Sequence, residues 1–581
     1  MKEKFDIQKK KKKKVGKVVG TVFMGFVLWL VYFLLCPPLS LAYVEGVVFF
    51  GFATIILISV IVMWSSKKEV MTHIGITLAI GSIILIIVIG IGKIAGAALF
   101  HEETLRSQLG EPKKIKFDEM IHQIDVAQIP IVDEELAKKQ ADKKIGEDIA
   151  LGSRIDLGDA AIQEVNGEIL WVIPLEHTDI FKWFKFHSTP GYITVSASNP
   201  NKVKYVSEID GKDLQIKYSN SSYFGNNLKR HIRNEGYKNF ALTEYTFEID
   251  DAGKPYWVVT AYKNKTVWSN GEAIGVVIVD AQTGETNFFG MKDDIPGWVD
   301  IVQPKKFIES QIDNWGKLVH GVLNFSNEDK IKKTDLTLTV YMEGDCYYFT
   351  GMTSVGSDES CSGFIMVNTR TKKSQICYMT GATETAAMKS AEGLVSNFGY
   401  TSTEPLPINV NGIPTYVMAL KDAEGLNKNY AMVNIDNYNI SAKGTTLQEA
   451  SRAYIQAVSK NSSTYVVGSD EAYGYNYEGI VERISAVVED GSTYYYLILD
   501  GKPNKIFMAP YSLSNELAIT REGDTVKVYY VDDSNGTVDI VSFENVAFAV
   551  QISDKQEERN ELDKGTSAIK SEKKWDYWFR V

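Results

Sequence analysis

GVVIVDAQTGETNFFG, residues 275–290, consists of a β-branched run, a polar turn and a second apolar run. β-Branched and aromatic runs bounded by Gly, Asn and Asp are typical of strands joined in hairpins. Close variants occur three more times, as GYITVS at 191–196, GFIMVN at 363–368 and NYAMVN at 429–434. A segment that returns in this way predicts an architecture of repeated supersecondary units.

The last residue of this motif indicates what the motif does. A valine shared by all four copies is followed by Ser196, Asp280, Asn368 and Asn434. Ser, Asp and Asn side chains all bind neighbouring backbone amides in turns, whereas a catalytic acid could not be exchanged for Ser or Asn. We therefore expect Asp280 to be the corner of a hairpin.

Further signals surround each copy of the motif. A glycine turn precedes each copy, at Gly167, Gly253, Gly344 and Gly412, and leads into a strand that contains aromatic residues. Helical stripes lie between copies, one running from Phe307 to Leu323 and another from 447 to 458 that opens with a Thr446/Glu449 capping box. The sequence therefore predicts tandem units of a helix and an antiparallel meander, two in 161–303 and two in 304–465.

KPYWVV and GVVIVDAQTGET, within residues 254–286, resemble the PepSY domain of membrane-anchored regulators of the cell envelope. The Thr-Gly of this copy is replaced by Thr371-Lys372, Asn437-Tyr438 and Asn199-Pro200 in the other units. The resemblance implies binding and inhibition of exported proteases or other envelope enzymes, with no catalytic residue to carry over. Convergent α+β meanders with ordinary turn chemistry are the alternative.

Three apolar segments precede the repeats, at about 18–36, 47–64 and 74–92. Each is long enough to cross about 30 Å of hydrocarbon as a helix. Lysines crowd the tail at 1–17 and recur at Lys67 and Lys68, whereas the loop after the first segment has none. Because basic flanks stay in the cytoplasm, we expect a cytoplasmic N-terminus, three membrane helices within 18–99 and an extracellular remainder.

The third apolar segment ends with Gly92 and Gly96, a GxxxG pattern that permits close packing of membrane helices and a homo-oligomer. The following residues, 100–160, are charged and mostly helical in pattern, with too few apolar positions for a core of their own. We expect a helical stalk there.

The last folded segment, 475–548, has five expected strands with glycine-containing turns and resembles an OB-fold barrel. OB-folds bind nucleic acids, sugars or proteins, but acidic residues outnumber basic ones here and the whole chain carries a net charge of −11. Nucleic-acid binding needs cations for the phosphates, so protein contact or structural capping is favoured. Residues 549–581 form a polar tail with an aromatic end.

No pattern in the sequence predicts a catalytic, cofactor-binding or metal-binding residue. The seven histidines are scattered, and HEETL at His101 lacks the second histidine of a zinc protease helix. Cys346, Cys361 and Cys377 could be buried thiols or include one disulfide. Aromatic residues expected to offer a partner-binding surface, with core packing as the alternative for the helical Trp315, are Trp298, Trp315, Tyr495, Trp575 and Trp578.

These features together predict a membrane-anchored α+β protein of a bacterial cell envelope. Its expected partners are the lipid bilayer and another envelope protein, which it would bind or regulate without catalysis and without a cofactor. Two other classes stay open on the sequence. One is an envelope enzyme without a recognisable motif, and the other is an accessory or structural subunit of a membrane transport or secretion assembly.

Overall fold

This computed structural model describes most of the chain in two compact units. The first unit holds residues 1–408, 416–428 and 435–438, and the second holds 409–415, 429–434 and 439–581. The expected aromatic contacts of Trp575 and Trp578 lie outside the described residues. The residues described are 2–65, 70–123, 128–147, 149–356, 360–410, 412–461, 475–489, 492–531 and 536–548.

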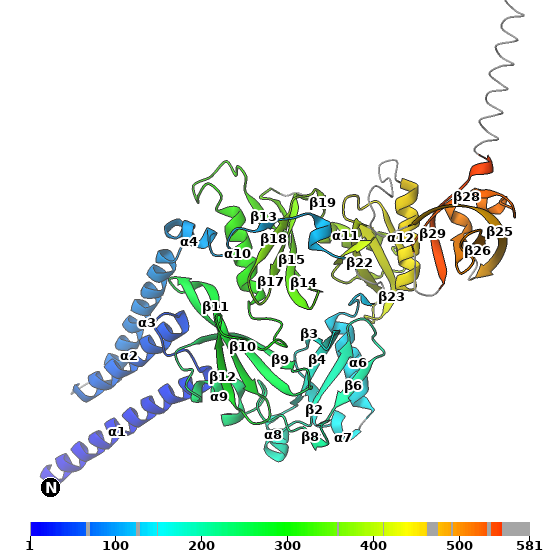
Figure 1. Cartoon of the computed structure of the whole chain (residues 1–581). Helices are drawn as coiled ribbons and strands as arrows, with labels where there is room; N and C mark the ends of the chain where they lie inside the picture. The colour runs from blue at the N-terminus through cyan, green and yellow to red at the C-terminus, as the bar shows by residue number, and fades with distance from the viewer. Residues whose placement is uncertain are drawn as a thin grey trace, which may run out of the picture. The chain divides into compact units, whose positions relative to one another are not determined.

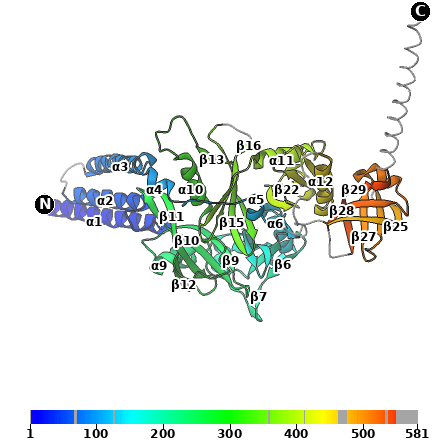
Figure 2. The ribbon, with the colours of Figure 1, turned by 45° about the horizontal axis from the view of Figure 1, so that its top comes forward.

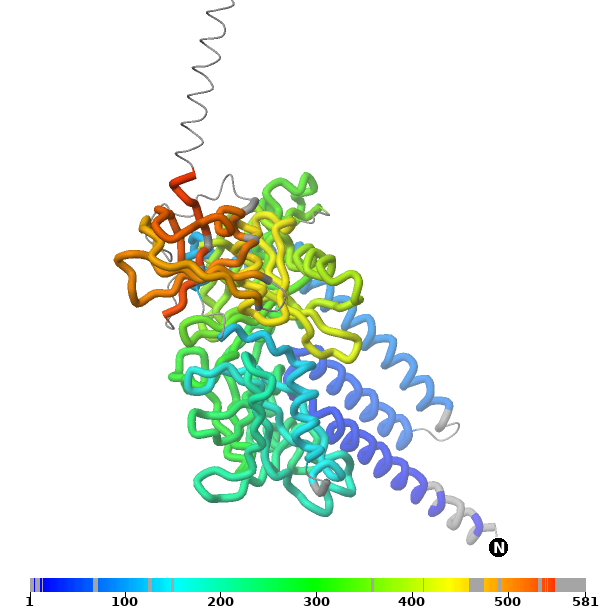
Figure 3. Tube along the Cα trace, turned by 90° about the vertical axis from the view of Figure 1, so that its right-hand side faces the viewer, coloured from blue at the N-terminus to red at the C-terminus, as the bar shows by residue number. Residues whose placement is uncertain are grey.

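Three long helices open the chain: α1 (Lys2–Leu35), α2 (Val44–Ser65) and α3 (Val70–Ala95). Each contains a stretch long and apolar enough to cross a membrane, at 14–35, 44–65 and 72–95. Three long apolar helices are therefore confirmed at the expected positions, and their apolar stretches have bounds a few residues different from those expected. Helix α2 packs against both neighbours, and in Figures 2 and 3 the three run alongside one another.

The loop between α1 and α2 binds directly to the second of the repeated sheets. The Tyr43 hydroxyl donates to the Tyr262 carbonyl at 2.9 Å, and the Trp268 indole N–H donates to the Leu41 carbonyl at 2.9 Å. Trp268 also lies on α3, since a Cβ added at Gly92 would be 1.9 Å from its ring. The Gly92–Gly96 face therefore packs against a hairpin of the second sheet, where we had expected another membrane helix.

The structure does not form the stalk expected at 100–160. Strand β1 (Lys113–Lys114) pairs in parallel with a strand of the sheet formed by the third repeat. Helix α6 (Glu134–Gly146) covers one face of the sheet formed by the first repeat. The buried residues of α6 are Leu136, Ala137, Ala141 and Ile145. They form a narrow apolar stripe, too small for a core of its own but sufficient to complete the core of a neighbouring sheet. The short helices α4 (Glu102–Arg106) and α5 (Phe117–Met120) lie in the same segment.

The first two repeats form two antiparallel sheets (Figure 1). The first has the order β2-β4-β5-β6, with β3 on the side of β4, and helix α8 lies between β4 and β5. The second has the order β12-β11-β10-β9 and follows helix α9. Their bounds are β2 (Ile155–Leu157), β3 (Ala161–Val165), β4 (Glu168–His177), α8 (Ile180–Phe186), β5 (Tyr192–Ser196), β6 (Val203–Val206), α9 (Leu228–Asn234), β9 (Ala241–Ile249), β10 (Pro255–Thr266), β11 (Ser269–Asp280) and β12 (Thr286–Gly290).

The third and fourth repeats each begin with a helix and continue as a sheet. The third sheet has the order β1-β18-β17-β15-β13 with β14 on β15, and the fourth has the order β20-β22-β23-β24 with β21 on β22. Their bounds are α10 (Lys305–Lys317), β13 (Ile331–Lys333), β14 (Leu338–Met342), β15 (Asp345–Ser354), β17 (Gly363–Asn368), β18 (Ser374–Cys377), α11 (Glu384–Gly393), β20 (Thr401–Ser402), β21 (Leu406–Val410), β22 (Ile413–Lys421), β23 (Asn427–Asn434) and β24 (Ser441–Gly444).

The repeated motif forms the hairpins expected of it. The four turn glycines, Gly167, Gly253, Gly344 and Gly412, have φ values of 79°, 83°, 78° and 79°, a left-handed conformation that favours glycine. Asp280 Oδ1 accepts from the amides of Gln282 and Thr283 at 2.8 and 3.0 Å. Asn368 Oδ1 accepts from the amides of Arg370 and Thr371 at 3.1 and 2.8 Å. The interpretation of Asp280 as a turn residue is therefore confirmed.

Helix α12 (Leu447–Asn461) and a closed barrel complete the described chain. Half of the expected capping box forms as predicted, because the Glu449 amide donates to Thr446 Oγ1 at 3.2 Å. The Glu449 carboxylate accepts from the Thr445 amide at 2.8 Å, one residue before the expected partner. The barrel has the order β25-β26-β27-β29-β28, with β27 and β29 parallel. Its strands are β25 (Tyr475–Glu489), β26 (Ser492–Leu499), β27 (Ile506–Pro510), β28 (Thr525–Val531) and β29 (Thr537–Asn545).

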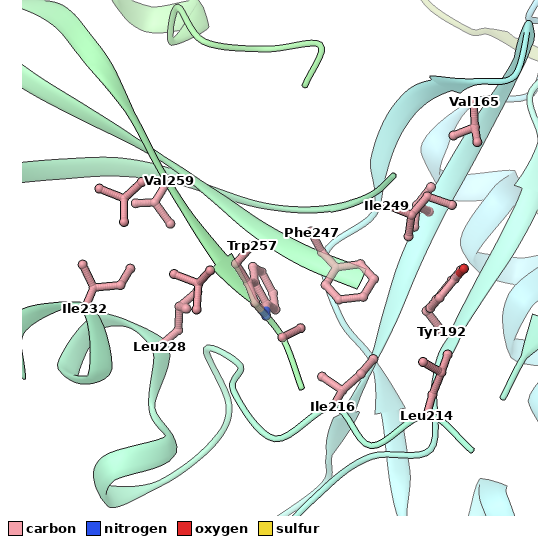
Figure 4. Close-up of a cluster of buried hydrophobic side chains, with 14 of the residues drawn as sticks. Val165, Tyr192, Leu214, Ile216, Leu228, Ile232, Phe247, Ile249, Trp257 and Val259 are labelled. Carbon is pink, nitrogen blue, oxygen red and sulfur yellow. The ribbon is translucent and has the colours of Figure 1, made fainter. Parts of the chain in front are cut away.

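One hydrophobic core joins the first two sheets. Tyr192 on β5 and Phe247 on β9 lie with ring centroids 5.8 Å apart, and Phe247 meets Trp257 on β10 at 5.2 Å. Ile216 and Leu228, from the connection between the sheets, are buried in the same cluster (Figure 4). Burial of large aromatic side chains on both sheets makes them one packed body.

Candidate binding groove and the buried carboxyl pair behind it

A groove of about 410 Å³ lies over the first sheet. Side chains alternate across a strand, so Ile173 and Ile193 face α6 and are buried with it. Leu170, Thr194 and Val206 point to the opposite face and form part of the groove floor. The groove therefore occupies the part of this sheet face that the joint core leaves open.

The turn before β10 forms the far wall of the groove. The Tyr192 hydroxyl donates to the Gly253 carbonyl at 2.6 Å, which attaches this turn to the first sheet. Within the turn, Asp250 Oδ1 accepts from the amides of Ala252 and Lys254 at 3.0 and 2.8 Å. This wall is therefore held in place by the protein itself, which lowers the ordering cost of binding.

The rim of the groove carries both signs of charge. Lys202 Nζ binds Glu168 Oε2 at 2.5 Å, which balances one positive and one negative side chain. The remaining charged lining residues are Lys204, Glu208, Asp210 and Asp251. With three carboxylates and one ammonium left, the groove has an acidic rim around an apolar floor. Such a site favours an extended peptide with basic and apolar side chains.

Two carboxyl groups are buried directly behind the groove wall. Ile249 lines the groove, and its neighbour Glu248 points to the other face of β9 and is 3% exposed. Burial, reinforced by the negative charge of Asp300, raises the pKa of Glu248 to about 8. Burial likewise raises the pKa of Asp300 to about 6. Thr246 Oγ1 donates to Glu248 Oε1 at 2.9 Å, and the Glu164 amide donates to Asp300 Oδ2 at 2.8 Å.

Three repeats meet at this carboxyl pair. Gln163 on β3 is fully buried and exchanges hydrogen bonds with the Ile249 backbone, accepting at 3.0 Å and donating at 2.6 Å. It also donates to the Trp298 carbonyl at 2.9 Å. Tyr341 of the third sheet donates to the Ile162 carbonyl at 2.8 Å. The pair thus sits in a polar joint that connects the repeats, and its burial separates it from substrates in solution.

Arg370 is a basic residue whose charge acts on both carboxyl groups of this joint. Its guanidinium donates to the carbonyls of Ile295, Pro296 and Gly297 at 2.9, 2.9 and 3.1 Å, and also to that of Val299. The segment just before Asp300 is therefore held by Arg370. The charge of Arg370 lowers the pKa of both Glu248 and Asp300, but less than burial raises it.

The aromatic residues expected to form a partner surface are not gathered in one place. Trp298 is half-buried and stacks on Tyr256, with ring centroids 4.8 Å apart. Trp315 is 8% exposed and packs in the core of the third repeat, so it is not a surface residue and the core-packing alternative holds for it. Tyr495 is half-buried against the barrel core.

The cysteines are free and buried. Burial raises the pKa of the Cys346, Cys361 and Cys377 thiols, which keeps them protonated at neutral pH and poorly reactive. Over the part of the chain that the structure describes, no group of three or more His, Cys, Asp or Glu side chains could hold a metal ion.

The groove and the carboxyl pair were not predicted from the sequence. One local signal was available, because TFEI at 246–249 places Thr246 and Glu248 on one face of a strand and two apolar residues on the other. A strand that joins two sheets buries both faces, so a glutamate there is desolvated. Recognising this requires knowing that Asp300 and the third repeat cover that face.

Comparisons with known proteins do not assign this chain to a family. No family model and no curated protein sequence matches this chain. Among solved structures, a levansucrase mutant from B. megaterium is similar at 10% identity, over 75% of this chain and 96% of the other, with a TM-score of 0.17. An exo-1,5-alpha-L-arabinanase from a bovine ruminal metagenomic library is similar at 9% identity, over 66% and 96%, with a TM-score of 0.15. TM-scores this low carry no argument about fold or function.

Proposed function

We propose that this chain is a non-catalytic multipass membrane protein of a bacterial cell envelope that binds another envelope protein through its groove. The observation that carries the proposal is the preformed groove of about 410 Å³, with an apolar floor and an acidic rim. Its occupant is a peptide segment of the partner, with basic side chains over Glu208, Asp210 and Asp251 and an apolar side chain on Leu170 and Val206. Binding there would assemble or inhibit the partner.

The organisation of the repeats supports this function. Four helix-and-meander units with hairpins of one design resemble PepSY domains, for which binding and inhibition of envelope enzymes are the implied roles. The strand order of the barrel and its single parallel pair, β27 with β29, are what an OB-fold would have. As a PepSY-like array followed by an OB-like barrel, the chain offers binding surfaces.

Reversing acidic charges of the groove tests the site. The variant Glu208→Lys with Asp251→Lys reverses two of the three carboxylates that remain on the rim. The variant Glu134→Lys with Asp142→Lys makes the same change in net charge at exposed positions of α6, on the other side of the first sheet. Full-length protein is crosslinked in its native membranes and purified by an affinity tag, and the co-purified proteins are quantified.

We expect a partner to be recovered with the wild-type and α6-variant chains and to fall by roughly tenfold or more with the groove variant, because each lost charge pair costs about 1 kcal/mol or more. Equal recovery with both variants would show that the groove is not the binding site. Absence of any crosslinked partner from wild-type membranes, together with turnover of an envelope substrate, would favour an enzyme.

The extracellular placement of the folded domains is a part of this proposal that has its own test. The lysines at the N-terminus and at 67–68 support a cytoplasmic N-terminus, and three crossings then carry the repeats outside. Protease added to intact cells should digest the region 160–550. Digestion only after the membrane is ruptured would place the repeats on the cytoplasmic side.

A further inference from the structure

Four aromatic side chains form an exposed cluster on helix α8 and in the loop before α9. We name this cluster the aromatic patch, and its members are Phe181, Phe184, Tyr223 and Phe224. Phe181 is 79% exposed and Phe184 is 53% exposed. Trp183 is buried beneath them, with ring centroids 5.1 Å from Phe184 and 5.7 Å from Phe224. The patch is therefore a fixed surface on a packed base.

The patch is continuous with the end of the first membrane helix. The ring centroids of Phe33 on α1 and Phe224 are 6.4 Å apart. The Arg230 guanidinium of α9 lies 3.8 Å from the centroid of the Phe33 ring and donates to the Phe33 carbonyl at 3.1 Å. Lys229 Nζ donates to the Leu35 carbonyl at 2.8 Å. These contacts place the patch at the level where α1 ends.

The end of α1 is itself exposed and apolar. Leu34 and Leu35 are both mostly exposed, and they complete the stretch 14–35 that is able to cross a membrane. A membrane-spanning helix must keep such side chains in lipid or at its boundary. The aromatic patch adjoins this apolar surface through the contact of Phe224 with Phe33, so a bilayer around α1 would also lie against the patch.

The chemistry of the patch fits a lipid boundary. Aromatic rings concentrate at the headgroup level of bilayers, and lysines next to them extend their ammonium groups toward phosphates. Helix α8, with the sequence IFKWFKF, alternates these two residue types, and Lys182 and Lys185 flank the exposed rings. A soluble surface would gain nothing from exposing Phe181 and Phe184 side by side.

We propose that the aromatic patch inserts into the headgroup region of the leaflet that faces the folded domains and acts as a second, peripheral membrane contact beside the three membrane helices. The second sheet is then held at a fixed height and tilt over the bilayer. The proposal is independent of the groove and of which side of the membrane carries the repeats, because it depends only on the end of α1.

A fluorescent label reports the environment of the patch directly. Phe184→Cys in the full-length chain is labelled with the environment-sensitive dye NBD, while the native cysteines are buried and serve as a check, since one label per chain shows that the fold is intact. The labelled protein is placed in nanodiscs of mixed zwitterionic and anionic phospholipid, with or without lipids that carry a nitroxide quencher near the headgroup. Phe398→Cys, at a 62% exposed phenylalanine of the loop after α11, is the matched control.

We expect the Phe184 label to emit at shorter wavelength than the Phe398 label and to be quenched severalfold more by the shallow nitroxide. A label at Phe181, which is more exposed and therefore tolerant of substitution, should behave in the same way. Water-like emission and control-level quenching at both positions would overturn the proposal. Protection in crude membranes that is lost in purified nanodiscs would also overturn it and would identify a protein as the occupant.

Discussion

Replacing Glu248 with Gln should make the protein more stable, and increasingly so at higher pH. The carboxyl group of Glu248 has a pKa of about 8 in the folded chain and 4.5 as its ordinary value. Between these values the folded chain binds a proton that the unfolded chain has released, so the free energy of unfolding falls as the pH rises through this window. Below pH 4.5 both states are protonated and the penalty is absent.

The free energy that ionised Glu248 costs the folded state follows from the difference between its two pKa values. At 1.36 kcal/mol for each pKa unit, the gap between 4.5 and about 8 costs about 5 kcal/mol once Glu248 is ionised, and about 3 kcal/mol of this develops between roughly pH 5.5 and pH 8.5. Gln keeps the oxygen that accepts from Thr246 Oγ1 and removes the titration. The advantage of the variant over wild type should therefore grow by about 3 kcal/mol between these pH values.

Thermal unfolding of the full-length chain in nanodiscs measures this difference. Each kcal/mol corresponds to about 2–4 °C in a domain of a few hundred residues, so the melting difference should widen by roughly 6–12 °C from low to high pH. Glu235→Gln, at an exposed position on α9's C-terminal side, is the matched control and should show no such widening. A melting difference for Glu248→Gln that is equal at both pH values would refute the reasoning.

Three further substitutions test other parts of the fold. Gly275→Ala should destabilise by about 2 kcal/mol in thermal melting, because its Cβ would lie 2.1 Å from the Phe289 carbonyl oxygen, whereas Gly146→Ala on α6 meets open space and should be neutral. Lys421→Met should cost about 1 kcal/mol and raise hydrogen exchange in α6, because Lys421 binds Asp133 at 2.7 Å; unchanged exchange would contradict this. Trp268→Ala should cost about 2 kcal/mol and raise exchange at the β10–β11 hairpin tip; retained protection there would mean that contact with α3 is dispensable.

Features set by local sequence were predictable. The apolar lengths of the membrane helices, the four left-handed turn glycines and the Thr446/Glu449 cap each depend on residues within one or a few turns of chain. The turn role of Asp280 followed from comparing it with the equivalent positions of the other repeats, since its Oδ1 accepts from the nearby amides of Gln282 and Thr283. Its second oxygen, Oδ2, pairs with Lys254 at 2.8 Å, a contact between strands that the comparison did not predict.

Features assembled from distant segments were not predictable. The apolar stripe of α6 was too narrow to indicate a core because its partners, Ile173 and Ile193, belong to a sheet later in the chain. The carboxyl joint brings Gln163, Glu248 and Tyr341 together from three repeats, and strand alternation says only which face each side chain takes. The sequence left Trp315 open between core packing and a surface anchor, and its burial in the core with the third sheet decides for core packing.

The end of the first membrane helix is completed by a part of the chain made much later. Arg233 donates to the Cys36 carbonyl at 3.3 Å across a separation of 197 residues, and Lys229 and Arg230 bind the last carbonyls of α1 in the same way. At about 5–20 residues per second, a ribosome needs roughly 10–40 seconds to supply these side chains after α1 has emerged. During biosynthesis, α1 therefore enters the bilayer before its last carbonyl groups have these side-chain donors. The folding of the second repeat then supplies the hydrogen bonds that fix this end of the helix.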